Sequence, residues 1–159
     1  MNLNPNTRVV VCCYQGDAHQ VMSLMPLYGH HECPVTVLSP GDSQVLLPGV
    51  DCRQGGKRCY IGWDGVDRMC IHLRILLDNY PERFFLIHDA DSILLDAKIP
   101  DFVYAEPDTL WSNLIGNNAP AQQPGFAPNM PHIAFHPPWF LSRRTIERLL
   151  AVHLSLIHI

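Results

Sequence analysis

The sequence predicts an α/β protein in which helices cover a mainly parallel β-sheet in three layers. Three neighbouring segments carry this prediction. The run from Arg8 to Tyr14 is apolar and β-branched, which is typical of a strand buried on both faces. A helical pattern from about Ala18 to Tyr28 follows, and then a second strand pattern from Pro34 to Ser39. A strand-helix-strand order favours parallel strands, because the helix carries the chain back across the sheet.

The first helix has recognisable boundaries. Asp17, in the turn after the first strand, is suited to cap its N-terminus, and Gly29 is suited to end it. Its apolar residues recur at the spacing of one helical face. They are Val21, Leu24, Met25 and Tyr28.

The clearest helical pattern in the chain runs from Asp64 to Tyr80, and Pro81 ends it. Before it, residues 50–53 and 58–61 are expected to form short strands around Gly55 and Gly56. After it, Phe84 to His88 is an apolar run that predicts a buried strand.

The last third of the chain is less regular. The elements expected there are a short strand at 102–104, a long loop at 117–131, a strand at 132–136 and a helix at 143–152 that Ser142 caps. The chain shows no internal repeat and no second domain.

Composition excludes several classes of protein. The net charge of −4 does not suit the basic surface of a nucleic-acid-binding protein. No apolar run approaches the roughly 20 residues that cross a bilayer, and residues 1–7 do not resemble a signal peptide. The six cysteines form no Cys-x-x-Cys pair, so neither a structural zinc site nor a redox motif is indicated. We expect a cytoplasmic protein without a nucleic-acid partner or a transmembrane segment.

The C-terminal residues 154–159, Leu-Ser-Leu-Ile-His-Ile, resemble the translated end of a sequencing adaptor. We therefore expect a partial domain at 1–153, incomplete at its C-terminus, followed by an artefactual tail. The alternative is a natural, slightly apolar helix end.

Asp89 and Asp91 are the strongest candidates for chemistry. They directly follow the buried strand that ends at His88, and ligands of open parallel sheets bind beyond the carboxyl ends of strands. Two carboxylates one residue apart can hold Mn²⁺ or Mg²⁺, directly or through water, together with phosphate oxygens. The alternative is a solvated turn after a strand.

The order of these elements resembles the nucleotide-binding half of GT-A fold glycosyltransferases. The stretch from Phe84 to Ser92, Phe-Phe-Leu-Ile-His-Asp-Ala-Asp-Ser, resembles the metal-binding Asp-x-Asp motif of that family. The stretch from Pro138 to Arg144 resembles its later segment, where a strand enters an acceptor-side helix. The resemblance implies a Rossmann-like sheet and transfer of a sugar from a nucleotide-diphosphate sugar to an unknown acceptor. It also implies that Asp89 meets ribose or metal and that Asp91 binds Mn²⁺ or Mg²⁺.

Three further residues are candidates for binding the nucleotide sugar. Tyr14 ends the first strand and is placed to stack on a base, unless it only packs in the core. Asp42 follows the second strand and is placed to accept a hydrogen bond from ribose or base, unless it only shapes a turn. Arg68 lies off the apolar stripe of the long helix and is placed to reach a phosphate, unless it pairs with Asp64.

Histidine and tryptophan residues give weaker signals. His88 precedes the Asp pair in the strand, so its side chain is expected to point away from Asp89 and to be structural. Trp111 and Trp139 are placed either to line a sugar pocket or to pack in the core.

Two alternative functions stay open. A haloacid-dehalogenase-like phosphatase also carries an Asp-x-Asp motif, but on its first strand, whereas two strand-helix units precede Asp89 here. A non-catalytic nucleotide-binding or metal-binding fragment is the other. The family's third metal ligand and catalytic base cannot be assigned, so we expect the fragment itself to bind metal weakly and to be inactive as a transferase.

Overall fold

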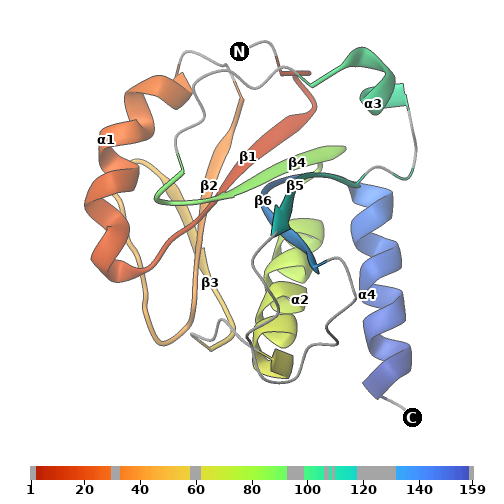
Figure 1. Cartoon of the computed structure of the whole chain (residues 1–159). Coiled ribbons are helices and arrows are strands. Elements are labelled where there is room, and N and C mark those ends of the chain that lie inside the picture. Colours follow the sequence, from red (N-terminus) through yellow and green to blue (C-terminus); the bar gives the residue numbers. More distant parts are fainter. Residues whose placement is uncertain are drawn as a thin grey trace.

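The computed structural model describes residues 3–29, 33–57, 62–92, 99–105, 108, 110–117 and 132–157 (Figure 1). The elements in chain order are β1 (Thr7–Cys12), the 3-10 turn η1 (Gln15–Asp17), α1 (Ala18–Gly29), β2 (Val35–Ser39), β3 (Asp51–Gln54), α2 (Gly62–Asn79), β4 (Phe84–Asp89), α3 (Asp101–Ala105), β5 (Leu110–Asn117), β6 (His132–Ser142) and α4 (Arg143–Ile157). The strand expected at 58–61 and the loop expected beyond Asn117 lie outside the described residues.

The strands form one six-stranded sheet in the order β3-β2-β1-β4-β6-β5. The first four strands in this order are parallel, whereas β6 runs antiparallel to both β4 and β5. This confirms the prediction of an α/β fold with a mainly parallel sheet. In the β1–β4 pair, Cys12 lies opposite Asp89, so the C-terminal ends of these two strands meet at the same edge.

Apolar residues cover both faces of the sheet, as the continuous apolar pattern of β1 predicts. On one face Val9 belongs to the same core cluster as Val21 of α1. On the other face Val10 clusters with Leu73 of α2 and Ile146 of α4. The helices therefore lie against opposite faces of the sheet, α1 on one and α2 with α4 on the other. None of the described helices is both long and apolar enough to cross a membrane.

Local signals placed most helices correctly. Both α1 and α2 are confirmed, and the Ser142 hydroxyl accepts a hydrogen bond from the Thr145 backbone N–H at 3.1 Å, as a cap of α4 should. Asp17 belongs to η1, which leads directly into α1.

The strand predicted at 102–104 is wrong, because these residues belong to the short helix α3. The segment begins with Pro100 and Asp101, a proline and an acidic residue that both favour the first turn of a helix. The Val103 backbone N–H donates to the Pro100 carbonyl at 2.9 Å. The Tyr104 ring then packs edge-on against Phe84 and Phe140. Three apolar residues were too few to distinguish a strand from one helical turn.

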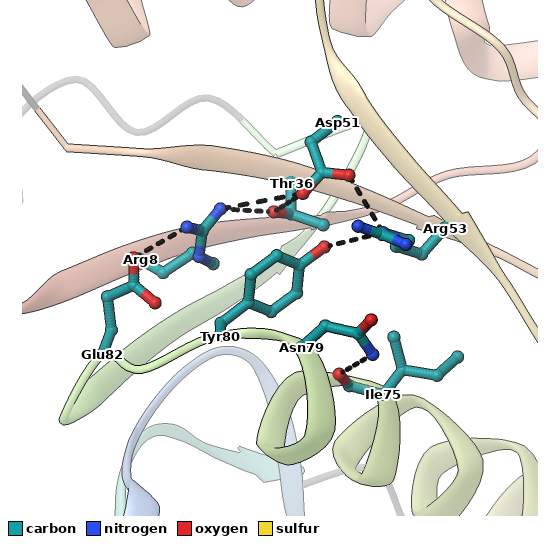
Figure 2. Close-up of polar contacts among 8 residues, drawn as sticks. All are labelled: Arg8, Thr36, Asp51, Arg53, Ile75, Asn79, Tyr80 and Glu82. Carbon is teal, nitrogen blue, oxygen red and sulfur yellow. Dashed lines mark hydrogen bonds and ion pairs between the residues drawn. The ribbon is translucent and has the colours of Figure 1, made fainter.

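A largely buried ion pair joins the N-terminal ends of the parallel strands (Figure 2). The guanidinium of Arg8 lies 2.7 Å from the carboxylate of Glu82, and these side chains are only 11% and 12% exposed. Arg8 also donates to the Thr36 hydroxyl at 2.7 Å, and its guanidinium lies 3.9 Å from the centre of the Tyr80 ring. These contacts join β1, the start of β2 and the segment before β4.

Arg143 connects α4 to the end of α2 and to the segment before β4. Its guanidinium donates to the carbonyls of Leu77 and Glu82, each at 3.2 Å, and to that of Tyr80. A helix leaves its last carbonyls without partners, and a cation is well suited to satisfy them. The first residue of α4 thereby caps the end of α2.

We predict that Glu82→Ala lowers the free energy of unfolding by about 3 kcal/mol, because it leaves the largely buried Arg8 guanidinium with only the more distant Asp51 carboxylate, 4.0 Å away. Urea denaturation followed by circular dichroism measures the loss. Glu147→Ala is the matched control, since Glu147 is exposed on α4 and its removal should change stability by less than about 0.5 kcal/mol. Equal losses in the two variants would contradict the structural role of the pair.

Candidate functional site

A cavity of about 470 Å³ opens at the C-terminal edge of the sheet, between the ends of β1 and β4. The chain leaves β1 towards β2 on one side, whereas β4 has β6 on its other side. Ligands of doubly wound α/β sheets bind where the strand order reverses in this way. Residues from the ends of both strands, from α2 and from β6 line the cavity.

Asp89 and Asp91 both line this cavity, at the edge that the sequence predicts. Asp89 is half-buried as the last residue of β4, and Asp91 is exposed. Between them, the Ala90 backbone N–H donates to the Cys12 carbonyl at 2.9 Å. The Ser92 N–H donates to the Asp89 carbonyl at 3.0 Å and closes a turn. Hydrogen bonds therefore fix the backbone that carries both carboxylates.

Tyr14 and Arg68 also line the cavity, and the Arg68 guanidinium donates to the Tyr14 hydroxyl. The turn after β3 packs closely against Arg68. A Cβ atom built on Gly56 would lie 3.0 Å from Arg68 Cγ and 3.2 Å from Arg68 Cα, so a larger residue would not fit there without a shift. Gly56 also has a φ of 72°, which favours glycine. A hydrogen bond between His72 Nε2 and the Gly55 carbonyl, at 3.0 Å, holds this turn against α2.

Asp42 is the predicted site residue that the structure does not bring to the cavity wall. It is exposed in the turn after β2 and is not among the lining residues, so a contact between Asp42 and a nucleotide stays a prediction. The alternative partner of Arg68, the Asp64 side chain, lies outside the described residues, as does the side chain of Trp111. Trp139 does line the cavity.

Cys12 and His72 line the cavity although their sequence positions gave no sign of it. Burial, reinforced by the nearby Asp89 carboxylate, raises the pKa of the Cys12 thiol to about 12. Burial also lowers the pKa of His72, which is therefore uncharged at neutral pH. An apolar strand pattern cannot show that Cys12 lies beside Asp89, because that contact depends on which strands are neighbours.

His88 points to the face of the sheet opposite the cavity, as its position in the strand predicts. Its side chain is completely buried, and its two ring nitrogens lie 3.0 Å from the Tyr28 hydroxyl and 2.9 Å from the Asp89 carbonyl. Burial is the main reason that the pKa of His88 is lowered. Burial likewise raises the pKa of Tyr28 to about 12. Both side chains are therefore neutral near pH 7.

The possible metal ligands in the cavity are few. Within the described part of the chain, no group of three or more His, Cys, Asp or Glu side chains is arranged to hold a metal ion. Magnesium, however, needs only one or two carboxylates when phosphate oxygens and waters complete its shell. Asp89 and Asp91 supply two carboxylates of this kind at the cavity wall.

Comparison with known proteins adds no assignment, since neither a protein-family model nor a curated protein matches the sequence. The functional argument therefore depends on the cavity and on the side chains that line it.

We predict that Cys12 in the folded chain resists alkylation by iodoacetamide at pH 8, although it lines a cavity. A pKa raised from 9.0 to about 12 lowers the reactive thiolate fraction roughly a thousandfold. Mass spectrometry of peptides measures the modification, and the urea-unfolded chain is the control. Rapid modification of Cys12 in the folded chain would show that the thiol is not held protonated.

Proposed function

We propose that this chain is the donor-binding part of a metal-dependent glycosyltransferase, with a three-layer, GT-A-like fold. The reaction would transfer a sugar from a nucleotide-diphosphate sugar to an acceptor that is not yet known. The observation that carries the proposal is the cavity at the reversal of strand order, which collects three carboxylates, a guanidinium and a phenol. Helices on both faces of a mainly parallel sheet support the three-layer, Rossmann-like arrangement.

The charge of the cavity favours a ligand that brings a metal ion. Three aspartates line it, Asp17, Asp89 and Asp91, whereas Arg68 is the only lysine or arginine among the lining residues that the structure describes. Because His72 is neutral, a diphosphate alone would meet a net negative wall. A divalent cation between the carboxylates and the phosphates reverses this repulsion.

Each lining residue has a distinct role in the proposed complex. Asp89 and Asp91 hold Mn²⁺ or Mg²⁺, and Asp89 is also placed to meet the ribose. The guanidinium of Arg68 exchanges its bond to the Tyr14 hydroxyl for one to a phosphate oxygen, which leaves the Tyr14 ring to pack beside the nucleobase. The metal, when bound, acts as a Lewis acid that stabilises charge on the departing diphosphate.

The first prediction of this proposal concerns metal dependence. Isothermal titration calorimetry with UDP and with GDP should detect binding in Mn²⁺ or Mg²⁺ and none in EDTA. Asp91→Asn should abolish this binding, whereas Asp78→Asn should not, because Asp78 makes the same charge change on an exposed position of α2 away from the cavity lining.

Unchanged nucleotide affinity in EDTA would contradict the bridging metal. Metal-dependent release of phosphate from p-nitrophenyl phosphate would instead favour the phosphatase, in which Asp89 attacks phosphorus.

The second prediction concerns Arg68. Arg68→Gln should weaken binding of UDP with Mn²⁺ by about tenfold to a hundredfold, because a charged hydrogen bond contributes roughly 1.5–3 kcal/mol. Arg74→Gln is the control, since Arg74 is exposed on the same helix and does not line the cavity. If both variants bind like the wild type while Mn²⁺ is still required, Arg68 does not contact phosphate.

A further inference from the structure

The turn that carries the two carboxylates has a buried support on the opposite face of the sheet. Beneath it lies His88, completely buried, with Nδ1 2.9 Å from the Asp89 carbonyl oxygen. The other ring nitrogen, Nε2, lies 3.0 Å from the hydroxyl of Tyr28 on α1. Tyr28 is itself only 3% exposed. Two contacts thus connect α1 to the backbone of Asp89: Tyr28 with His88, and His88 with the Asp89 carbonyl.

The partners of His88 determine where its proton sits. A backbone carbonyl can only accept, so Nδ1 must carry the hydrogen that is donated to Asp89. In a neutral imidazole, Nε2 is then an acceptor, and the Tyr28 hydroxyl must donate to it. The Asp89 carbonyl therefore selects the tautomer with the proton on Nδ1, and the Tyr28 hydroxyl holds the ring in that orientation by donating to Nε2.

We propose that His88 is a positioning residue for Asp89 and Asp91, and that Tyr28 orients it. The inference deepens the proposed function, since it concerns the same pair of carboxylates. His88 and Tyr28 themselves would not touch the ligand, because neither lines the cavity.

The Asp89 carbonyl is the point at which this support acts. It accepts two hydrogen bonds, one from His88 Nδ1 and one from the Ser92 backbone N–H at 3.0 Å. The second bond closes the turn on which Asp91 lies. Without the first, the Asp89 peptide group keeps only the Ser92 bond to its carbonyl and the Ala90 N–H bond to Cys12, so the separation of the two carboxylates is less tightly fixed. Residues that orient metal ligands in this indirect way typically change metal affinity about tenfold to a hundredfold.

Two substitutions of His88 separate positioning from packing. In His88→Asn, the amide nitrogen takes nearly the place of Nδ1 and can still donate to the Asp89 carbonyl. In His88→Gln, the longer side chain places its amide near Nε2, so it retains the contact with Tyr28 and loses that with Asp89. A packing role predicts that Gln is the better replacement, because it fills more of the buried space. A positioning role predicts the reverse.

The test measures binding of Mn²⁺ in the presence of UDP by electron paramagnetic resonance, on the 159-residue chain and its variants. We expect His88→Gln to weaken Mn²⁺ binding at least about tenfold and His88→Asn to bind more tightly than His88→Gln. Tyr28→Phe, which keeps the ring but loses the hydroxyl, should weaken binding to an intermediate degree. Tyr80→Phe, at the opposite edge of the sheet, is the matched control and should bind like the wild type. Equal affinity of the Asn and Gln variants, or tighter binding by Gln, would overturn the proposal.

Two readouts need no ligand and separate this inference from the proposed function. Two-bond ¹H–¹⁵N NMR spectra should show the His88 proton on Nδ1, and hydrogen exchange of the Ser92 amide should be faster in His88→Gln than in His88→Asn. A proton on Nε2, or equal exchange in the two variants, would overturn the positioning role even if UDP and Mn²⁺ bind. If the wild type binds neither UDP nor Mn²⁺, the proposed function fails, and these two readouts alone decide whether His88 fixes the turn.

Discussion

The site exists because β1 and β4 pair in parallel. Their register sets Cys12 opposite Asp89, and the pairing continues beyond β4, where the Ala90 N–H bonds to the Cys12 carbonyl at 2.9 Å. This pairing brings Tyr14 and the Asp89–Asp91 turn, which are far apart in the sequence, to one edge of the sheet. The strand order reverses between β1 and β4, so the segments that follow them lead to opposite sides and leave a cavity beyond the two strand ends.

The two edges of the sheet differ in how their charged side chains are balanced. At the N-terminal edge, Arg8 and Glu82 form a largely buried ion pair, and the Arg8 guanidinium also contacts the Tyr80 ring, so charge is neutralised within the protein (Figure 2). At the C-terminal edge, the described residues that line the cavity include three aspartates and one arginine, and this excess of carboxylates is the basis of the proposed metal site.

The sequence predicted what depends on local pattern. The apolar runs of β1 and β4, the stripe of α2 and the Ser142 cap all have causes within a few residues, and each is confirmed. What it missed depends on distant partners. Residues of β5 gain their strand pairing only from β6, and β6 extends through Pro137 and Pro138, which disfavour a strand locally. Likewise, the sequence could not show that Cys12 and His72 line the cavity and that Asp42 does not, because this depends on which distant segments become neighbours.

Paramagnetic broadening by Mn²⁺ tests the central claim most directly, because it locates the ion within the fold. With UDP present, a substoichiometric amount of Mn²⁺ should first broaden the backbone amide NMR signals of Cys13, Ala90 and Ser92, around the cavity. The amide signals of Thr36 and Asp51, at the opposite edge, should stay sharp. Broadening that begins elsewhere, or that is uniform along the chain, would contradict a metal-nucleotide site at the β1–β4 reversal.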